Sequence, residues 1–382
     1  MRVIATVFVI GLLAGCSSER NPGGQAANTT PAVVSGPAPS PNTTPATTQE
    51  PATPRIDVTS STESQATTEP ITGTEPATTT ESTSVAADWC ARSGTERIGT
   101  VNGADIVEAS GLVASRNQPG VYWTHNDGSD TRLFAVGEDG SDLGVFDVGA
   151  AGGIAARDIE DIALIDREGV SELLIADFGD NLRERESIQL IEVPEPDLSS
   201  PSEVVEAQAI DFVYPDGPHN AETLLVDADA GLFFIVTKDQ DESTSAPQGL
   251  GPTLPAVIYE GPLDSAPGGE PIELVARGTI DLPALSDQAT RSRAHPFALL
   301  GAAGVATGGD VAADGSLIAL RTYETVWLWD RATGVSIPDA LAGVPCEITA
   351  VFEQQGEAVA FAGDRLVTIG EGNNPPINVV AS

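Results

Sequence analysis

Five segments of this chain, spread from residue 110 to near the C-terminus, follow one plan. Each begins with an acidic or small polar residue, continues with an apolar run and a turn, and ends with a second apolar run and a polar cluster. Further β-rich runs follow most of these pairs, and no long helical periodicity lies among them. The segments begin at Ser110, Glu160, Glu222, Asp310 and Glu357.

Four antiparallel strands per repeat are typical of the blade of a β-propeller. The sequence therefore predicts an all-β fold, a β-propeller with five blades. The third and fourth blades are expected to take their fourth strands from residues 272–276 and, less clearly, 334–337. Six blades are the alternative, because the interval between Glu222 and Asp310 is the longest. We favour an inserted loop at 283–304, since this stretch lacks a second pair of strands.

The last repeat has too few residues for a complete blade. It offers two strands and a third apolar run at 377–380. A strand near residues 96–101, at the other end of the repeat region, can supply the fourth. This closure would join the first and last blades and cover an otherwise open sheet edge.

The N-terminal residues have the pattern of an exported lipoprotein. A basic Met1-Arg2 precedes an apolar run that ends in Leu13-Ala-Gly-Cys16, so we expect a signal peptide at 1–15 and lipid on Cys16. More than one acyl chain, palmitate among them, would anchor Cys16 stably to a membrane. Residues 16–87 are rich in Thr, Pro and Ser and are expected to form a disordered tether. The propeller domain is assigned to 88–382.

The chain contains three cysteines. Lipid on Cys16 leaves Cys90 and Cys346, and an even pair in an oxidising exported compartment favours a disulfide. Cys90 precedes the closing strand and Cys346 precedes the last repeat, so a bridge between them would lock the ring near its seam.

The formal net charge of −38 excludes nucleic acid as a partner, because its phosphates would be repelled. It is compatible with cation binding and with a solvated exported surface. We expect the protein on the outer face of the cell membrane, with an unknown ligand or an envelope protein as its partner.

Acids open four of the five repeats. In a propeller the first strand of each blade lines the central channel, so Glu160, Glu222, Asp310 and Glu357 are expected to converge at one end of it. Ser110 breaks the pattern, and Glu108, two residues earlier, is the candidate to substitute for the missing acid. Oxygen ligands of this kind suit Ca²⁺ best, with Mg²⁺ or Mn²⁺ behind. A second tier of acids follows the second strands: Asp127, Asp177, Asp180 and Asp239.

Three polar clusters fall in strand-end loops, where functional residues concentrate. Taken singly, each is also explained as a turn; together on one face they predict a catalytic or ligand-binding site. His125 and His219 are the candidates for proton transfer. The candidate residues are His125, Asn126, Asp127, Asp177, Asp180, Asn181 and His219.

The phrases at 158–163, 177–181 and 214–222, together with the lipobox and the tether, resemble propeller lipoproteins of high-GC Gram-positive bacteria. That resemblance implies no particular activity. Glutamates that open the blades are more distantly similar to those of gluconolactonase-like and phytase-like propellers, which implies Ca²⁺ in the channel. Those propellers are usually six-bladed, and the scarcity of basic residues near these acids argues against a phytase.

Two hypotheses for the function follow. In the first, the acidic propeller is a non-catalytic binding module for a ligand or a protein partner, with Ca²⁺ at its site. In the second, it is a Ca²⁺-dependent hydrolase of a lactone or an ester, with the site at the channel mouth and His125 or His219 as the base. We favour the binding module.

Overall fold

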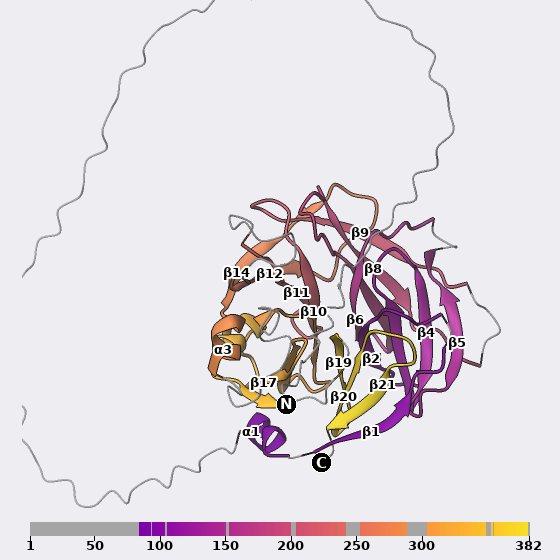
Figure 1. Ribbon diagram of the computed structural model, residues 1–382. Helices are drawn as coiled ribbons and strands as arrows, with labels where there is room; N and C mark the ends of the chain where they lie inside the picture. Colours follow the sequence, from indigo (N-terminus) through magenta and orange to yellow (C-terminus); the bar gives the residue numbers. More distant parts are fainter. Residues whose placement is uncertain are drawn as a thin grey trace, which may run out of the picture. The chain divides into compact units, whose positions relative to one another are not determined.

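A computed structural model shows a five-bladed β-propeller, which confirms the predicted fold class (Figure 1). The structure describes residues 84–92, 94–103, 105–149, 153–199, 204–241, 253–288, 304–348, 353 and 355–380. The blades follow the ring in chain order. Each sheet is built from strands that are consecutive in the chain, with two exceptions: the N-terminal strand joins the C-terminal blade, and the short β13 (Ile272–Glu273) is added to the sheet of blade 2.

Each blade contains four antiparallel strands, which follow one another from the channel outward. Blade 1 contains β2 (Ala109–Ala114), β3 (Val121–Asn126), β4 (Arg132–Gly137) and β5 (Asp142–Asp147). Blade 2 contains β6 (Ile159–Arg167), β7 (Val170–Asp177), β8 (Ile188–Pro194) and β9 (Gln208–Val213). Blade 3 contains β10 (Ala221–Asp227), β11 (Leu232–Thr237), β12 (Ala256–Pro262) and β14 (Val275–Ile280).

Blade 4 contains β15 (Gly308–Val311), β16 (Leu317–Arg321), β17 (Val326–Asp330) and β18 (Cys346–Ile348). Blade 5 contains β19 (Gly356–Ala362), β20 (Arg365–Gly370), β21 (Pro376–Val380) and the N-terminal strand β1 (Thr95–Thr100). The part of the chain that the structure describes also contains the short helices α1 (Val85–Cys90), α3 (Leu282–Gln288) and α4 (Ile337–Leu341).

The hydrophobic core is divided among the five interfaces between neighbouring blades. Each inner sheet is therefore covered on both faces, which explains why its strands read as continuous apolar runs rather than as alternating ones. In β7, for example, the four successive residues from Leu173 to Ala176 are all fully buried. Aromatic side chains pack within these interfaces, as Trp123 does edge-on against Phe146.

Side chains of the innermost strands hold neighbouring blades together by bonding to backbone atoms. Asp161 of blade 2 accepts from Leu224 N of blade 3 at 2.8 Å and from Gly309 N of blade 4 at 3.3 Å. Ser110 Oγ of blade 1 donates to Glu160 O of blade 2 at 2.8 Å. These contacts link the inner strands around a narrow channel.

The ring closes as predicted. β1 pairs antiparallel with β21, from Thr95 opposite Val380 to Thr100 opposite Pro376, and completes blade 5. The predicted disulfide between Cys90 and Cys346 is present, with the two Cα atoms 6.1 Å apart. It ties α1 to β18 of blade 4, so one bond bridges the seam between blades 4 and 5.

Two of the predicted fourth strands are wrong. Residues 272 and 273 form β13 (Ile272–Glu273), which pairs in parallel with β9 of blade 2, and the fourth strand of blade 3 is β14. Likewise α4 begins at Ile337, where a strand was expected, and β18 is the outer strand of blade 4. Pro338 in the first turn of α4 and the Ser336 N-cap, which accepts from Asp339 N, explain the helix.

Several predictions concern residues outside the described ones. They are the signal peptide at 1–15, the lipidated Cys16, most of the tether at 16–87, and the part of the inserted loop between 289 and 303. The predicted domain boundary at 88 falls inside α1. Among the described residues, none of the helices has the length and apolar character needed to span a membrane.

Candidate functional site

Three of the four predicted channel acids occupy equivalent positions. Glu160, Glu222 and Glu357 each lie at a β-bulge near the start of the innermost strand of blades 2, 3 and 5. The bulge leaves these residues out of the regular pairing and re-aims their side chains, as bulges commonly do near functional sites. In blade 1 the equivalent bulge position is Gly111, and the exposed Glu108 lies before the strand.

Asp310 does not join these glutamates. β15 pairs with β16 without a bulge, so the acid stands further along its strand. Its carboxylate accepts from Val311 N at 2.8 Å and Phe361 N at 2.7 Å, and it lines a pocket beside Asp227 and Arg331, where the inner strands end. Burial raises the pKa of Asp310 to about 7. The prediction that all four acids converge is therefore wrong for Asp310.

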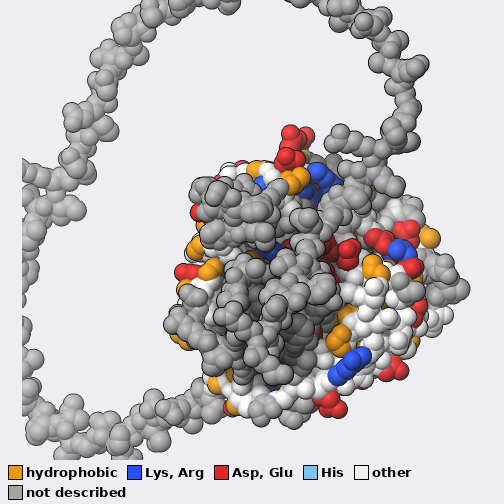
Figure 2. All heavy atoms as spheres, viewed as in Figure 1, with side chains coloured by type: hydrophobic (Ala, Val, Ile, Leu, Met, Phe, Trp, Pro, Cys, Tyr) orange, Lys and Arg blue, Asp and Glu red, His pale blue; other side chains and the backbone are white. Residues whose placement is uncertain are grey.

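A compact group of carboxylates lies where the inner strands begin. Asp127 follows β3, while Asp158 and Glu160 lie at the start of β6, and ligand oxygens of all three lie within 4.8 Å of one another. We call these three residues the carboxylate triad. Figure 2 shows acidic side chains near the centre of this face. Three carboxylates this close repel one another unless they hold protons or a cation.

The pKa values reflect this crowding. Burial, followed by the charges of Asp127 and Glu222, raises the pKa of Asp158 to about 7. Burial, followed by the charges of Glu222 and Asp127, holds the pKa of Glu160 well above its ordinary range. The pKa of Glu371, after β20, is also raised to about 7 by burial and then by the charges of Asp127 and Glu222.

Blade 2 holds the triad in place through the loop after β7. Asp177 accepts from Asp158 N at 2.8 Å and pairs with the buried Arg185 at 2.9 Å. Gly179 lies directly against the triad: a Cβ there would come within 2.0 Å of Glu160 Oε1 and 2.6 Å of Asp158 Oδ2. A glycine is needed at this close approach, so the Asp-Phe-Gly-Asp-Asn loop fits around the carboxylates.

A lysine of blade 3 accompanies the carboxylates at the channel mouth. Lys238, directly after β11, contacts the Glu222 carboxylate and donates to Tyr323 Oη at 2.7 Å. Glu357 Oε2 is buried and has no hydrogen-bond partner among the described residues. The scarcity of basic residues inferred from the sequence is thus wrong at this point, because Lys238 and Arg185 both lie beside the acids.

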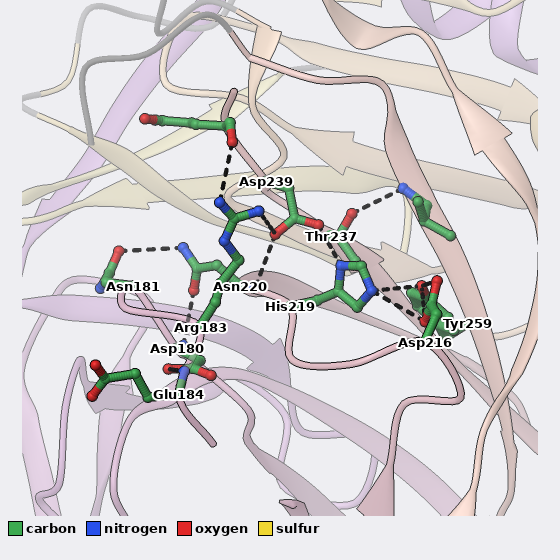
Figure 3. Close-up of polar contacts among 12 residues, drawn as sticks. Asp180, Asn181, Arg183, Glu184, Asp216, His219, Asn220, Thr237, Asp239 and Tyr259 are labelled. Carbon is green, nitrogen blue, oxygen red and sulfur yellow. Dashed lines mark hydrogen bonds and ion pairs between the residues drawn. The ribbon is translucent and has the colours of Figure 1, made fainter. Parts of the chain in front are cut away.

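His219 belongs to a second polar network, in the loop before β10 (Figure 3). Its Nδ1 lies 2.5 Å from Asp239 Oδ2, and its Nε2 lies 2.8 Å from Tyr259 Oη and 3.2 Å from Asp216 Oδ1. Burial by itself lowers the pKa of His219, but the hydrogen bonds and charges of Asp239 and Asp216 outweigh it and raise the pKa above its ordinary value. His219 thus bonds to carboxylates through both ring nitrogens.

Asn220 connects this network to the loop of blade 2. Its Oδ1 accepts from Asp180 N at 2.9 Å and its Nδ2 donates to Asn181 Oδ1 at 3.2 Å, while its own N donates to Asp239 Oδ1 at 3.1 Å (Figure 3). Asp180 also accepts from Glu184 N and Arg185 N, as expected of a turn residue. The two predicted clusters of blades 2 and 3 therefore meet on one face.

The first predicted cluster is divided. Asp127 joins the triad, but His125 is completely buried, and burial lowers its pKa to about 4. Asn126 Oδ1 accepts from Val107 N at 3.1 Å and Glu108 N at 3.2 Å, which fixes the loop before β2. Since His125 is buried and neutral, it is not available for proton transfer to a ligand on the surface.

Sequence reasoning missed three residues of the channel mouth: Asp158, Lys238 and Glu371. Asp158 lies two residues before Glu160, within the phrase at 158–163, and nothing in the sequence marked it as a separate site residue. Lys238 and Glu371 each follow the second strand of a repeat, as Asp127 does. A comparison of the residue that follows the second strand in each repeat would have identified Lys238 and Glu371 from the sequence.

Comparisons with known proteins add little beyond the fold. No protein-family model matches this chain, and no curated protein matches it in sequence. Among solved structures, it is similar to a chain of a nidogen/laminin complex at 12% identity, covering 69% of this chain and 72% of that chain, with a TM-score of 0.35. It is also similar to the Cps50 (Swd1) β-propeller domain of Myceliophteria thermophila at 14% identity, covering 71% and 82%, with a TM-score of 0.31.

Proposed function

We propose that the protein is a binding module whose propeller holds a divalent cation, Ca²⁺, at the channel mouth and binds its ligand or partner on the same face. The propeller fold is compatible with a binding role. The observation that supports a cation site is the carboxylate triad, in which Asp127, Asp158 and Glu160 bring ligand oxygens within 4.8 Å of one another.

The chemistry of the triad favours Ca²⁺ over softer metals. All of its side-chain donors are carboxylate oxygens, the ligands of hard cations, and Ca²⁺ accepts irregular geometry in which water completes the shell. A bound Ca²⁺ would also remove the mutual repulsion that raises the pKa of Asp158. Gly179 supports the same assignment, because its missing side chain leaves room for the carboxylates to converge.

The experiment is a thermal melt of the full chain in chelator and with Ca²⁺ added. Binding of one ion stabilises the folded state by about 2.7 kcal/mol when free Ca²⁺ is one hundred times Kd. Asp158→Asn and Gly179→Ala should abolish this shift, the first by removing a ligand and the second by displacing two. Asp229→Asn, an exposed acid beyond the far end of β10, is the matched control and should retain it. If the melting temperature of the wild type does not depend on Ca²⁺, the proposed Ca²⁺ site is refuted.

We further propose that the module is displayed on the outer face of the cell membrane by lipid on Cys16, where an envelope protein or an external ligand would meet it. The lipobox at residues 13–16 supports this proposal. Labelling of cells with a palmitate analogue should mark the wild type but not Cys16→Ala. A labelled Cys16→Ala chain, or an unlabelled wild type, would contradict it.

The hydrolase is the second candidate, and neither of the two histidines predicted as its base is well placed for that role. His125 is buried. Both ring nitrogens of His219 are already bonded, to Asp239 and to Asp216, and its raised pKa widens the pH range over which the ring is protonated. A panel of lactones and esters with Ca²⁺ present tests this ranking, and turnover that is lost in both Glu160→Gln and His219→Gln would reverse it.

A further inference from the structure

The lysine at the channel mouth lies where a cation would otherwise be expected. Lys238 Nζ contacts the carboxylate of Glu222, donates to Tyr323 Oη at 2.7 Å, and lies 4.8 Å from the centre of the Tyr323 ring. Its backbone N donates to Asn220 O at 2.8 Å, which fixes the start of the side chain. The ammonium group is thus enclosed by an acid and an aromatic ring rather than extended into solvent.

The carboxylates of the mouth therefore form two groups. The triad of Asp127, Asp158 and Glu160 lies on the side of blades 1 and 2. Glu222 and Glu357 lie on the side of blades 3 and 5, and Lys238 counteracts the effect of burial on the pKa of both. The charge of Lys238 also opposes the burial that raises the pKa of Asp127 in the triad, but among the described residues its ammonium group contacts a carboxylate of the second group, Glu222.

Glu357 provides an independent sign that this second group is built for a cation. Its side chain is buried, its Oε2 has no hydrogen-bond partner among the described residues, and the charges of Glu222 and Lys238 both act on it. A buried carboxylate oxygen without a donor is costly unless a positive charge compensates it. Lys238 supplies one positive charge, whereas a divalent cation would supply two.

We propose that Lys238 takes the place of a second divalent cation between Glu222 and Glu357 and so limits the channel mouth to one Ca²⁺, bound by the triad. This inference rests on the proposed function for the first ion and specifies how many ions the same mouth accepts. A tethered ammonium occupies its position without the entropy cost of capturing a free ion, and it repels a second cation at this distance. Removal of the ammonium should therefore open a second Ca²⁺ site.

Equilibrium dialysis of the full chain against Ca²⁺, in a buffer with about 0.15 M KCl to screen surface charges, tests this proposal. Lys238→Met should bind one more ion than the wild type. Lys238→Arg keeps the charge and should match the wild type, as should the double variant Lys238→Met/Glu222→Gln, which removes the carboxylate together with the ammonium.

The two proposals fail differently in this experiment. The number of Ca²⁺ ions bound by the wild type tests whether the triad binds an ion. The difference in bound Ca²⁺ between Lys238→Met and the wild type tests whether Lys238 excludes a second ion. A folded Lys238→Met chain that binds no additional Ca²⁺ overturns the inference and leaves the triad untouched. If this variant is unfolded in chelator, it is compared with Lys238→Met/Asp158→Asn, which lacks a ligand of the triad: recovery of the wild-type circular dichroism spectrum by both chains on adding Ca²⁺ supports the second site, and failure of the double variant to recover in millimolar Ca²⁺ overturns it.

Discussion

The stability that the disulfide at the ring seam contributes can be predicted from the length of the loop that it closes. Cys90 and Cys346 are 256 residues apart in sequence, so the bond constrains nearly the whole propeller in the unfolded chain. For a loop of this length, chain entropy gives about 5.6 kcal/mol of stabilisation at 25 °C as an upper value, and native disulfides usually contribute about 2–5 kcal/mol. We expect Cys90→Ser/Cys346→Ser to lose stability in that range.

The remaining contacts at the seam explain why the double variant should still fold. β1 keeps its pairing with β21, and Trp89 stays packed in the interface of blades 4 and 5, edge-on to Phe361. At about 2 °C per kcal/mol for a domain of this size, the melting temperature should fall by about 4–10 °C. The assay is denaturant unfolding of the wild type and the variant, each without reductant, followed by Trp fluorescence.

Hydrogen exchange supplies the local readout. Amides of β1 and β21 should exchange faster in the double variant, while those of β7 in blade 2 should change only by the global loss of stability. A loss below about 1 kcal/mol, far under the entropic value, would refute the reasoning that the bond restrains the unfolded ring. Equal acceleration in β1 and β7 would refute the assignment of the bond to the seam.

Two further predictions concern buried charges. The pKa of His219 is raised in the folded protein, so its interactions stabilise the fold below the ordinary pKa of about 6.5 and are lost as the pH rises through the raised value. His219→Gln should therefore be less stable than the wild type at pH 5.5, with a smaller difference at pH 9 in urea unfolding; a constant difference would contradict the linkage. Arg321 and Glu353 form a fully buried ion pair at 2.6 Å, and Arg321→Met should cost about 3–5 kcal/mol because it leaves a buried carboxylate unpaired. The double variant Arg321→Met/Glu353→Gln should recover part of this loss in the same unfolding assay, and no recovery would show that packing against Gly356 dominates instead.

The strand repeats and the closure of the ring were predictable because they depend on local patterns. Apolar runs broken by turns identify strands, and a repeat that lacks a strand requires one from the other end of the chain. The errors in blades 3 and 4 have a local explanation as well. Both segments contain apolar residues, but Ile272 pairs with the neighbouring blade and Ile337 follows a helix N-cap.

The candidate site was predictable only in part. Glu160, Glu222 and Glu357 share a bulge at the start of the inner strand, so their position in the repeat identified them. Asp310 looked equivalent in sequence, yet β15 has no bulge. Because successive side chains of a strand point to opposite faces, a difference of one residue in register is enough to redirect an acid.

The sequence by itself determined the blade repeat, the strand that closes the ring and the cysteine pair that secures it, because strand periodicity and turn residues act locally. Only the tertiary structure decided which charges meet. Asp127, Asp158 and Glu160 come from two blades, and Lys238 reaches the mouth from a third. Their proximity depends on the packing of whole sheets around one channel, a long-range condition that no short stretch of sequence contains.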